Sequence, residues 1–185
     1  MLLTTDRLIL REFVERDWPA VLAYQTDPLY LRYYHWTERT EADVRAFVQM
    51  FLAQQQAQPR LKFQLAVILK AEEQLIGNCG IRLDEPDGHK ANIGYELAPP
   101  YWGQGYATEA AQVIVAFGFS ELRVHRIEAD CIAENIGSVR VLEKLGMRRE
   151  GHLRENEWIK NRWWDTFLYG LLVDEWRAQQ AMGKP

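Results

Sequence analysis

Two glycines, at positions 103 and 105, lie between an apolar strand and an apolar helix and constrain this chain more than any other feature. Residues 93–98 form a run short and apolar enough for a strand, and residues 110–119 form one long enough for a buried helix. Glycine lets backbone N–H groups turn toward one point and lets a ligand approach closely. These N–H groups stand at a helix N-terminus, where unpaired donors and the helix dipole favour an anion. The segment therefore predicts a loop that binds a phosphate or a pyrophosphate.

Two common phosphate-binding loops do not fit this segment. A Walker loop ends in Gly-Lys-Ser or Gly-Lys-Thr, and no lysine lies between Lys90 and Lys144. A dinucleotide-binding loop needs a third glycine within an early βαβ unit, whereas Thr108 stands at that position and the loop follows residue 100. The phosphate loop of this chain is therefore of a different class.

Residues 102–107 resemble the Q/R-x-x-G-x-G/A loop with which GNAT acetyltransferases bind the pyrophosphate of acetyl-CoA, and they lie within the fuller string 101–110, Tyr-Trp-Gly-Gln-Gly-Tyr-Ala-Thr-Glu-Ala. It is similar to the branch that contains the ribosomal-protein-alanine N-acetyltransferases, and it departs from the loop pattern at Trp102, which replaces glutamine or arginine. A second segment, 133–147, is similar to the N-x-x-S-x-R-V-L-E-K-L-G-F segment of the same branch. Two motifs at the proper spacing are more specific than either one.

Length and composition suit a single domain spanning residues 1–185. The net charge is −4 and no basic run exceeds two residues, which argues against a nucleic-acid partner. No segment has the length of a membrane span or the apolar core of a signal peptide, so we expect a cytoplasmic protein without a membrane partner. The 4 histidines are scattered and predict no metal site. Cys79 and Cys131 are expected to be buried and reduced.

Periodic apolar residues predict individual strands and helices along the chain, and the resemblance implies that they form a mixed, mostly antiparallel central sheet with helices on both faces. The expected strands cover residues 5–13, 63–69, 75–83, 91–97, 125–133, 153–160 and 163–172. The expected helices cover residues 17–24, 40–52, 110–119 and 135–145, with a short last helix from Asp174. Asp17 and Thr40 are expected to cap the first two helices, and Gly146 to end the fourth. This order of elements matches the α/β (α+β) GNAT fold along essentially the whole chain.

The resemblance implies that acetyl-CoA binds in a splay between the strands at 91–97 and 125–133. Backbone groups of Leu97 and Ala98 would pair with the pantetheine arm as an added strand would. Asn135 would hydrogen-bond the arm from the opposite side, and it is also suited to cap the helix that follows. The pyrophosphate would be held by the loop residues Gly103, Gln104, Gly105, Tyr106, Ala107 and Thr108.

The implied reaction is direct attack of an acceptor amine on the thioester carbonyl. A backbone N–H near Leu97 is the expected oxyanion donor. Glu157 is the leading candidate for the base that removes the ammonium proton, and Glu96 is the alternative. Many GNAT proteins protonate the departing thiolate with a tyrosine in the helix after the fifth strand. Leu142 lies near that place here, so Ser138 or a water molecule would have to serve.

A site without an obvious strong base favours an acceptor amine of low pKa. A free α-amino group titrates near about 7.7–8.0 and a lysine near about 10.4, so a protein or peptide N-terminus is the expected acceptor. A small-molecule amine, such as an antibiotic or a polyamine, is the alternative substrate, and a non-catalytic acyl-CoA-binding regulator is the alternative function. A homodimer is common among relatives, although no feature of this sequence demonstrates one.

The segment 30–36 is dense in aromatic residues and is expected to be irregular. It either packs as core beneath a loop or forms one wall of an acceptor groove, since aromatic side chains combine apolar area with a polar handle. The sequence leaves both interpretations open.

Overall fold

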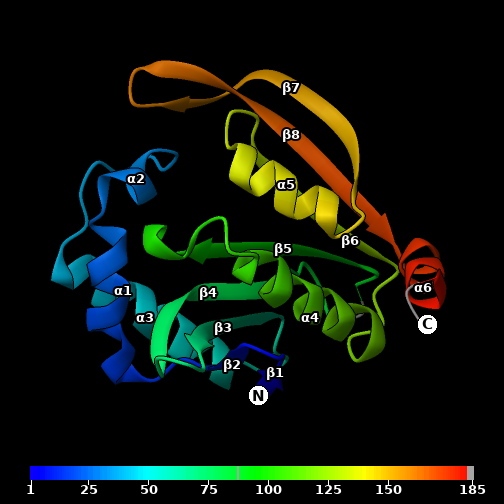
Figure 1. Ribbon diagram of the computed structural model, residues 1–185, viewed down its shortest axis with the longest axis horizontal. Coiled ribbons are helices and arrows are strands. Elements are labelled where there is room, and N and C mark those ends of the chain that lie inside the picture. Colours follow the sequence, from blue (N-terminus) through cyan, green and yellow to red (C-terminus); the bar gives the residue numbers. More distant parts are fainter. Residues whose placement is uncertain (87, 183–185) are drawn as a thin grey trace.

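In the computed structural model, which describes residues 1–86 and 88–182, eight strands pair in one sheet (Figure 1). Their order across the sheet is β1-β2-β3-β4-β5-β6-β8-β7. The strands are β1 (Leu2–Thr4), β2 (Leu8–Glu12), β3 (Lys62–Leu69), β4 (Gln74–Leu83), β5 (Lys90–Leu97), β6 (Arg126–Ile132), β7 (Arg148–Ile159) and β8 (Arg162–Leu172). All neighbours are antiparallel except β5 and β6, which run parallel. The predicted mixed, mostly antiparallel sheet is confirmed.

Strands β5 and β6 are paired only at one end. Their register runs from Lys90↔Arg126 to Asn92↔Glu128, and pairing stops there although β5 continues to Leu97. Diverging strands leave backbone N–H and C=O groups without ladder partners, and such groups are costly to bury unless something bonds to them. The splay expected between these two strands is therefore present.

Helices cover both faces of the sheet (Figure 1). They are α1 (Trp18–Gln25), α2 (Pro28–Leu31), α3 (Glu41–Gln56), α4 (Tyr106–Ser120), α5 (Ile136–Lys144) and α6 (Val173–Met182), with 3₁₀ turns η1 (Glu15–Asp17) and η2 (Pro99–Tyr101). On β3, Leu65 and Val67 pack in the hydrophobic cluster that includes α4, whereas Ala66 and Ile68 pack in the cluster that includes α1 and α3. Because side chains alternate along a strand, a strand buried on both faces is apolar throughout.

The element boundaries differ from the expected ones at several places, among them β7, which begins at Arg148 rather than at residue 153. Helix α4 begins at Tyr106 rather than at residue 110, because its first turn includes Thr108 and Glu109 and does not read as an apolar run. Strand β1 and the short helix α2 were not predicted. The first long strand, β2, covers only the middle of the expected range 5–13.

The expected helix caps are correct in two cases and wrong in one. Thr40 and Asp43 form the predicted capping box on α3, and Gly146 follows α5 with φ 74°. Asp17 stands before α1, but its side chain makes no capping hydrogen bond. Instead its carboxylate accepts both guanidinium prongs of Arg11, at 2.7 and 2.8 Å. The bidentate hydrogen bonds from the charged guanidinium are stronger than hydrogen bonds from the neutral amides of the helix end, so the carboxylate binds Arg11 instead of capping α1.

Candidate active site

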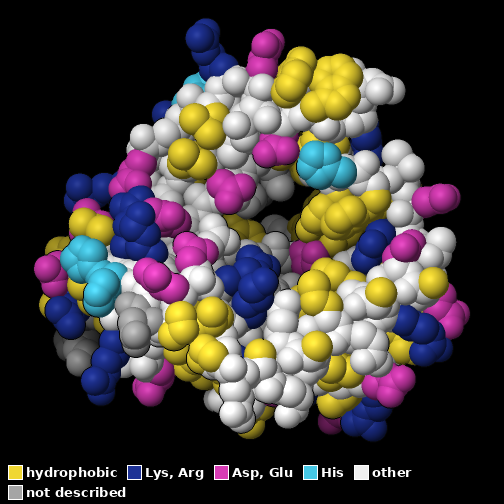
Figure 2. Space-filling view, turned by 180° about the vertical axis from the view of Figure 1, so that it is seen from behind, with side chains coloured by type: hydrophobic (Ala, Val, Ile, Leu, Met, Phe, Trp, Pro, Cys, Tyr) yellow, Lys and Arg dark blue, Asp and Glu magenta, His cyan; other side chains and the backbone are white. Residues whose placement is uncertain are grey.

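A cavity of about 900 Å³ extends from the glycine loop to the segment 29–35. Its walls come from β5, the loop, the start of α4, the end of β6, α5 and the β7–β8 hairpin. Figure 2, which views the molecule from the side opposite to Figure 1, shows a deep hollow near the middle of that face. Residues far apart in the sequence therefore share one space.

The glycine loop presents backbone donors at one end of this cavity. Gly103 (φ 74°) and Gly105 (φ 85°) adopt the left-handed conformation that residues with a Cβ disfavour. Gly105 occupies the N-cap position of α4 and brings no capping side chain, so the N–H groups of the first turn remain available. The loop residues that line the cavity are Gly103, Gly105, Tyr106, Ala107 and Thr108. A glycine cradle of this kind at a helix N-terminus fits a pyrophosphate.

Gln104 behaves differently from the other predicted loop residues. Its side-chain Nε2 donates to the Pro100 carbonyl at 2.9 Å, and its own carbonyl accepts from Arg7 Nη1 at 3.0 Å. It is not among the described residues that line the cavity. Gln104 therefore braces the loop from behind and has only its N–H left for a ligand.

Of the two residues expected to pair with the pantetheine arm, only Leu97 lines the cavity. The N–H of Ala98 donates to the Ile76 carbonyl at 2.8 Å, and its carbonyl accepts from the N–H of Tyr101 at 3.0 Å. Neighbouring residues of an antiparallel strand direct their backbone groups to opposite sides. The N–H of Leu97 is therefore directed toward the splay, while its carbonyl accepts from Trp102 Nε1 at 2.7 Å. This geometry directs one backbone donor, the N–H of Leu97, to a ligand in the splay, whereas both backbone groups of Ala98 are bonded within the protein.

Asn135 and Ser138 lie at the start of α5, on the opposite wall of the cavity. The Oδ1 atom of Asn135 accepts the N–H of Ser138 at 3.2 Å, so the predicted cap is confirmed. The Oγ atom of Ser138 lies 2.9 Å from the hydroxyl of Tyr95. The sequence analysis missed Tyr95, although alternation along β5 places it on the same face as Leu97 and could have indicated it.

The groups around Ser138 hold their protons at neutral pH. Burial raises the pKa of Tyr95 well above its ordinary value, and the hydrogen bond with Ser138 opposes that rise. Burial also raises the pKa of Cys131 to about 11, again against a hydrogen bond with Ser138. Both Cys79 and Cys131 are buried free thiols, as predicted.

Glu157 lies at the other end of the cavity, on the inner face of the β7–β8 hairpin. It faces Trp164 across the hairpin and precedes the buried Ile159 by two residues, so its side chain points toward the cavity that it lines. The side chain is 39% exposed, and a carboxylate oxygen lies 3.5 Å from Nε2 of His35. A carboxylate in this position can reach an amine directly or through water.

Glu96, the alternative base, is surrounded by hydrogen-bond donors. The five donors are Tyr24 Oη (2.6 Å), Gln25 Nε2 (3.1 Å), Asn78 Nδ2 (2.5 Å), Tyr30 Oη (2.5 Å) and Tyr34 Oη (3.1 Å). A carboxylate offers about four lone-pair sites, so this one has no capacity left for the proton of an amine. Burial and the charge of Glu96 raise the pKa values of Tyr24 and Tyr30, which keeps these hydroxyls as donors. The arrangement favours Glu157 over Glu96 as the base.

The aromatic segment serves in both of the ways that the sequence left open. Tyr30 is buried in the core and stacks on Tyr34, which stacks in turn on Trp36, with ring centroids 4.7 Å apart in each pair. Tyr30, Tyr33 and Tyr34 also line the cavity. The segment is therefore core on one side and a cavity wall on the other.

The tip of the β7–β8 hairpin contacts this wall, as the arching hairpin of Figure 1 suggests. The Nζ atom of Lys160 donates to the Leu31 carbonyl at 2.7 Å. The rings of Tyr33 and Trp164 meet edge to face with centroids 5.5 Å apart. These contacts bridge the end of the cavity that Glu157 lines.

Residues 1–86 and 88–182 hold no group of three or more His, Cys, Asp or Glu side chains placed to bind a metal ion. None of the helices that the structure describes is long and apolar enough to cross a membrane.

Comparison with known proteins relates this geometry to a family. The model of the acetyltransferase (GNAT) domain matches residues 7–148. The N-acetyltransferase YnaD of Bacillus subtilis is 41% identical over 176 residues, covering 95% of this chain and 99% of YnaD. A GNAT-family acetyltransferase from Bacillus anthracis is similar in structure, with a TM-score of 0.82, 36% identity and coverage of 95% and 100%. RimL, a ribosomal α-N-protein acetyltransferase in complex with coenzyme A, shares the fold at 19% identity, with a TM-score of 0.83 and coverage of 95% and 99%.

Proposed function

The chain belongs to the GNAT acetyltransferase family and is an acetyl-CoA-dependent N-acetyltransferase, and from this premise we propose that its acceptor is the α-amino group of a protein or peptide N-terminus. The observation that carries the proposal is the partly exposed carboxylate of Glu157, which faces the cavity at its acceptor end. The similarity in fold to RimL, whose name describes an α-N-protein acetyltransferase, agrees with this choice.

The chemistry of a single carboxylate base favours an α-amine over a lysine. Carboxylates are weak bases, with ordinary pKa values near about 4. The pKa values of a lysine and an α-amine differ by about 2.5 units, so presenting a lysine as its free base costs about 3.5 kcal/mol more. An acceptor that is already partly deprotonated near neutral pH needs less help from Glu157.

The roles of the chain's own groups follow from their places around the cavity. Bound acetyl-CoA supplies the activated acetyl thioester. The amides from Gly105 to Thr108 hold its pyrophosphate, and the alignment of reactants that results is worth up to about 7–11 kcal/mol. The N–H of Leu97 donates to the thioester carbonyl oxygen as negative charge develops there. Glu157 accepts the ammonium proton of the acceptor.

Ser138 is the proposed proton donor to the departing thiolate. Its hydroxyl faces the cavity and lies 2.9 Å from the hydroxyl of Tyr95. Burial raises the pKa of Tyr95, so this neighbour keeps its proton, and its hydroxyl also donates to the backbone carbonyl of Ser138 at 3.1 Å. Ser138 regains from water the proton that it gives to the thiolate. Asn135 would hydrogen-bond the pantetheine arm with its amide group while its Oδ1 caps α5.

A small-molecule amine is the second candidate acceptor. The contacts of Lys160 with Leu31 and of Tyr33 with Trp164 favour it, because they bridge the acceptor end and leave less room for a long chain. A peptide would have to enter N-terminus first, beside this bridge.

Turnover on two matched panels of acceptors tests the proposal. One panel holds short peptides with free α-amines and acetylated lysines, and the other holds polyamines, aminoglycosides and Nα-acetylated lysine peptides. We expect transfer to the α-amines, located by mass spectrometry, with kcat/KM at least about tenfold above any member of the second panel. Preferred transfer to a small amine or to lysine side chains would overturn the proposal.

A further inference from the structure

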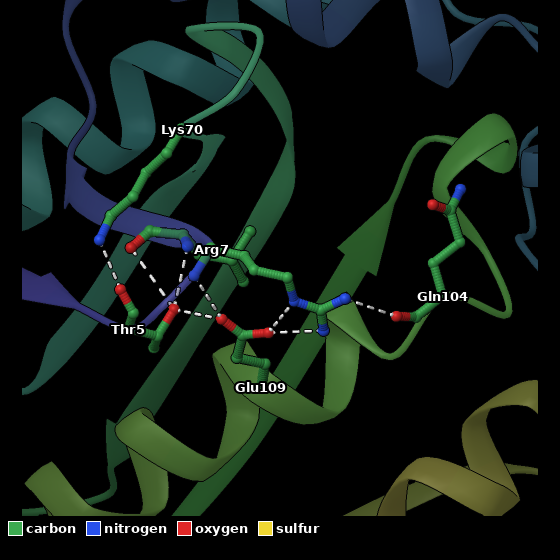
Figure 3. A network of polar contacts seen from close by, with 6 residues as sticks. Thr5, Arg7, Lys70, Gln104 and Glu109 are labelled. Atoms are coloured by element: carbon green, nitrogen blue, oxygen red, sulfur yellow. Dashed lines mark hydrogen bonds and ion pairs between the residues drawn. The ribbon is translucent and has the colours of Figure 1, made fainter.

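Behind the phosphate loop, away from the cavity, the segment before β2 meets the first turn of α4 at one carboxylate (Figure 3). Glu109, in the first turn of α4, accepts from Thr5 Oγ1 at 2.5 Å, from the N–H of Arg7 at 3.0 Å and from Nε of Arg7 at 2.6 Å. The same guanidinium donates from Nη1 to the Gln104 carbonyl at 3.0 Å and lies over the Tyr106 ring, 4.4 Å from its centroid. Arg7 therefore touches both the loop and the helix that follows it.

The position of Arg7 is itself fixed by the sheet. Its carbonyl accepts from the backbone N–H of Lys70 at 3.0 Å, and Nζ of Lys70 donates to the Thr5 carbonyl at 2.5 Å. Thr5 and Leu8 close the turn before β2, with Oγ1 of Thr5 accepting the N–H of Leu8 at 3.0 Å. The guanidinium therefore extends from a segment that backbone hydrogen bonds fix in place toward a loop that has two glycines.

We propose that Arg7 is a positioning residue for the cosubstrate, because its hydrogen bond to the Gln104 carbonyl orients the N–H of Gly105 toward the pyrophosphate. The peptide between Gln104 and Gly105 is planar and trans, so its C=O and N–H point in opposite directions. Holding the carbonyl at the back of the loop directs the N–H to the front, where Gly105 lines the cavity. This inference rests on the proposed role of the loop as the pyrophosphate site.

An outside restraint is needed because glycine leaves the peptide free to rotate. Gly103 and Gly105 both have positive φ and no Cβ to limit the orientation of the peptide between them. Arg7 is not among the described residues that line the cavity, so it acts through the loop. Its charge also balances that of Glu109, which would otherwise repel a phosphate near the same helix end.

The test compares ligands with and without a pyrophosphate on three variants, Arg7→Ala, Arg7→Lys and Arg45→Ala. Arg45 is a matched control: its side chain is 45% exposed against 46% for Arg7, it pairs with Glu41, and it lies over the ring of Trp18. Calorimetry measures the Kd of coenzyme A, and ligand-observed NMR titration measures that of pantetheine, which has no pyrophosphate. Circular dichroism confirms that each variant is folded.

We expect Arg7→Ala to weaken coenzyme A binding about tenfold while pantetheine binding changes less than about twofold. Arg7→Lys should behave like Arg7→Ala, because a lysine keeps the charge but cannot hold Glu109 and the Gln104 carbonyl together. Arg45→Ala should change neither. Unchanged coenzyme A affinity in Arg7→Ala, or full affinity in Arg7→Lys, would overturn the proposal.

The affinities of the wild-type protein for coenzyme A and pantetheine separate the role proposed for Arg7 from the role proposed for the loop. If the wild type bound coenzyme A and pantetheine equally well, the loop would not be a pyrophosphate site and both proposals would fall. If it preferred coenzyme A and Arg7→Ala kept that preference, only the role of Arg7 would be wrong.

Discussion

The two ends of the cavity are formed by different kinds of groups. The proposed cosubstrate end is formed by two short segments: the loop at 103–108, which offers backbone donors, and the helix start at 135–138, which adds the side chains of Asn135 and Ser138. The acceptor end consists of side chains from widely separated segments, among them Tyr30 and Glu157. A ligand shared by all relatives can be held by backbone donors that most substitutions leave in place. An acceptor that differs between relatives has to be recognised by side chains.

The two ends also differ in how they are held in position. Arg7 and Glu109 hold the loop from its exposed back, whereas the acceptor wall is tied to β5 by hydrogen bonds that converge on the half-buried Glu96. A network of buried polar groups is stable only while every member has a partner. The acceptor end should therefore respond more sharply to the loss of one side chain than the loop does.

The largest effect is expected at the acceptor end. Glu157→Gln keeps the shape of the side chain and removes the proton acceptor, so kcat should fall by about 10²–10⁴-fold while the Kd of coenzyme A is unchanged. Steady-state kinetics on the preferred acceptor and calorimetry measure the two quantities. Glu150→Gln on the same strand, which loses only an exposed pair with Arg126, is the control and should keep its activity.

The same variant distinguishes the two candidate bases. If Glu157→Gln kept more than about a third of wild-type turnover while Glu96→Gln lost nearly all of it, the base would be Glu96. If both variants stayed active on the preferred acceptor, the free-base fraction of the amine or a chain of water molecules would carry the proton.

A smaller effect is expected at the cosubstrate end. Gly105→Val places a branched side chain where the backbone has φ 85° and where an added Cβ would lie 3.3 Å from Nη2 of Arg7, so the Kd of coenzyme A should rise at least about tenfold. Gly103→Ala is the control for backbone strain alone, because its φ is 74° and its Cβ would meet nothing within 4 Å. Calorimetry that found wild-type affinity in a folded Gly105→Val protein would contradict the phosphate-loop assignment.

Asn135→Ala tests whether the cap of α5 also binds the cosubstrate. Loss of the hydrogen bond to the Ser138 N–H should cost about 0.5–2 kcal/mol in the free energy of unfolding, and the KM for acetyl-CoA should rise. Thr40→Ala removes the equivalent cap from α3, remote from the cavity, and should lose similar stability with no change in KM. Equal KM values in the two variants would leave Asn135 as a cap only.

The smallest expected effect is on the pH dependence of stability, through the carboxylate of Glu109 behind the loop. Burial raises the pKa of Glu109, but the hydrogen bonds from Thr5 and Arg7 outweigh it, so the pKa lies below its ordinary value. A carboxyl with a lower pKa in the folded state stabilises the fold above its unfolded pKa of about 4.3, and this stabilisation is lost as the pH falls through the folded pKa.

Melting temperatures of the wild type and Glu109→Gln should therefore differ by about 2–4 °C at most near neutral pH and converge in acid. The control is Glu41→Gln, which removes the exposed pair with Arg45. A difference between the wild type and Glu109→Gln that grew in acid would have the wrong sign for this ion pair.

Much of the fold could be predicted because the signals are local. Capping at Thr40, the helix end at Gly146 and the strands around the glycine loop were all predicted from patterns a few residues long. Asp17 was assigned wrongly because its partner, Arg11, competes with the helix end through a contact that no local rule includes. The splay of β5 and β6 was expected from the resemblance to a family, whereas their parallel pairing was not predicted, and periodicity alone gave no reason for either.

The sequence by itself determined the glycine loop at a helix N-terminus and the cap at Asn135, because glycine conformation and helix ends act within a few residues of the chain. Only the tertiary structure decided that Glu157 faces the cavity, that Glu96 is saturated by five donors and that Tyr95 lies against Ser138. It also brought Arg7 behind the loop. The physical reason is that the direction of a side chain and its partners across the fold depend on how distant segments pack, and packing distances are not encoded in any short stretch of residues.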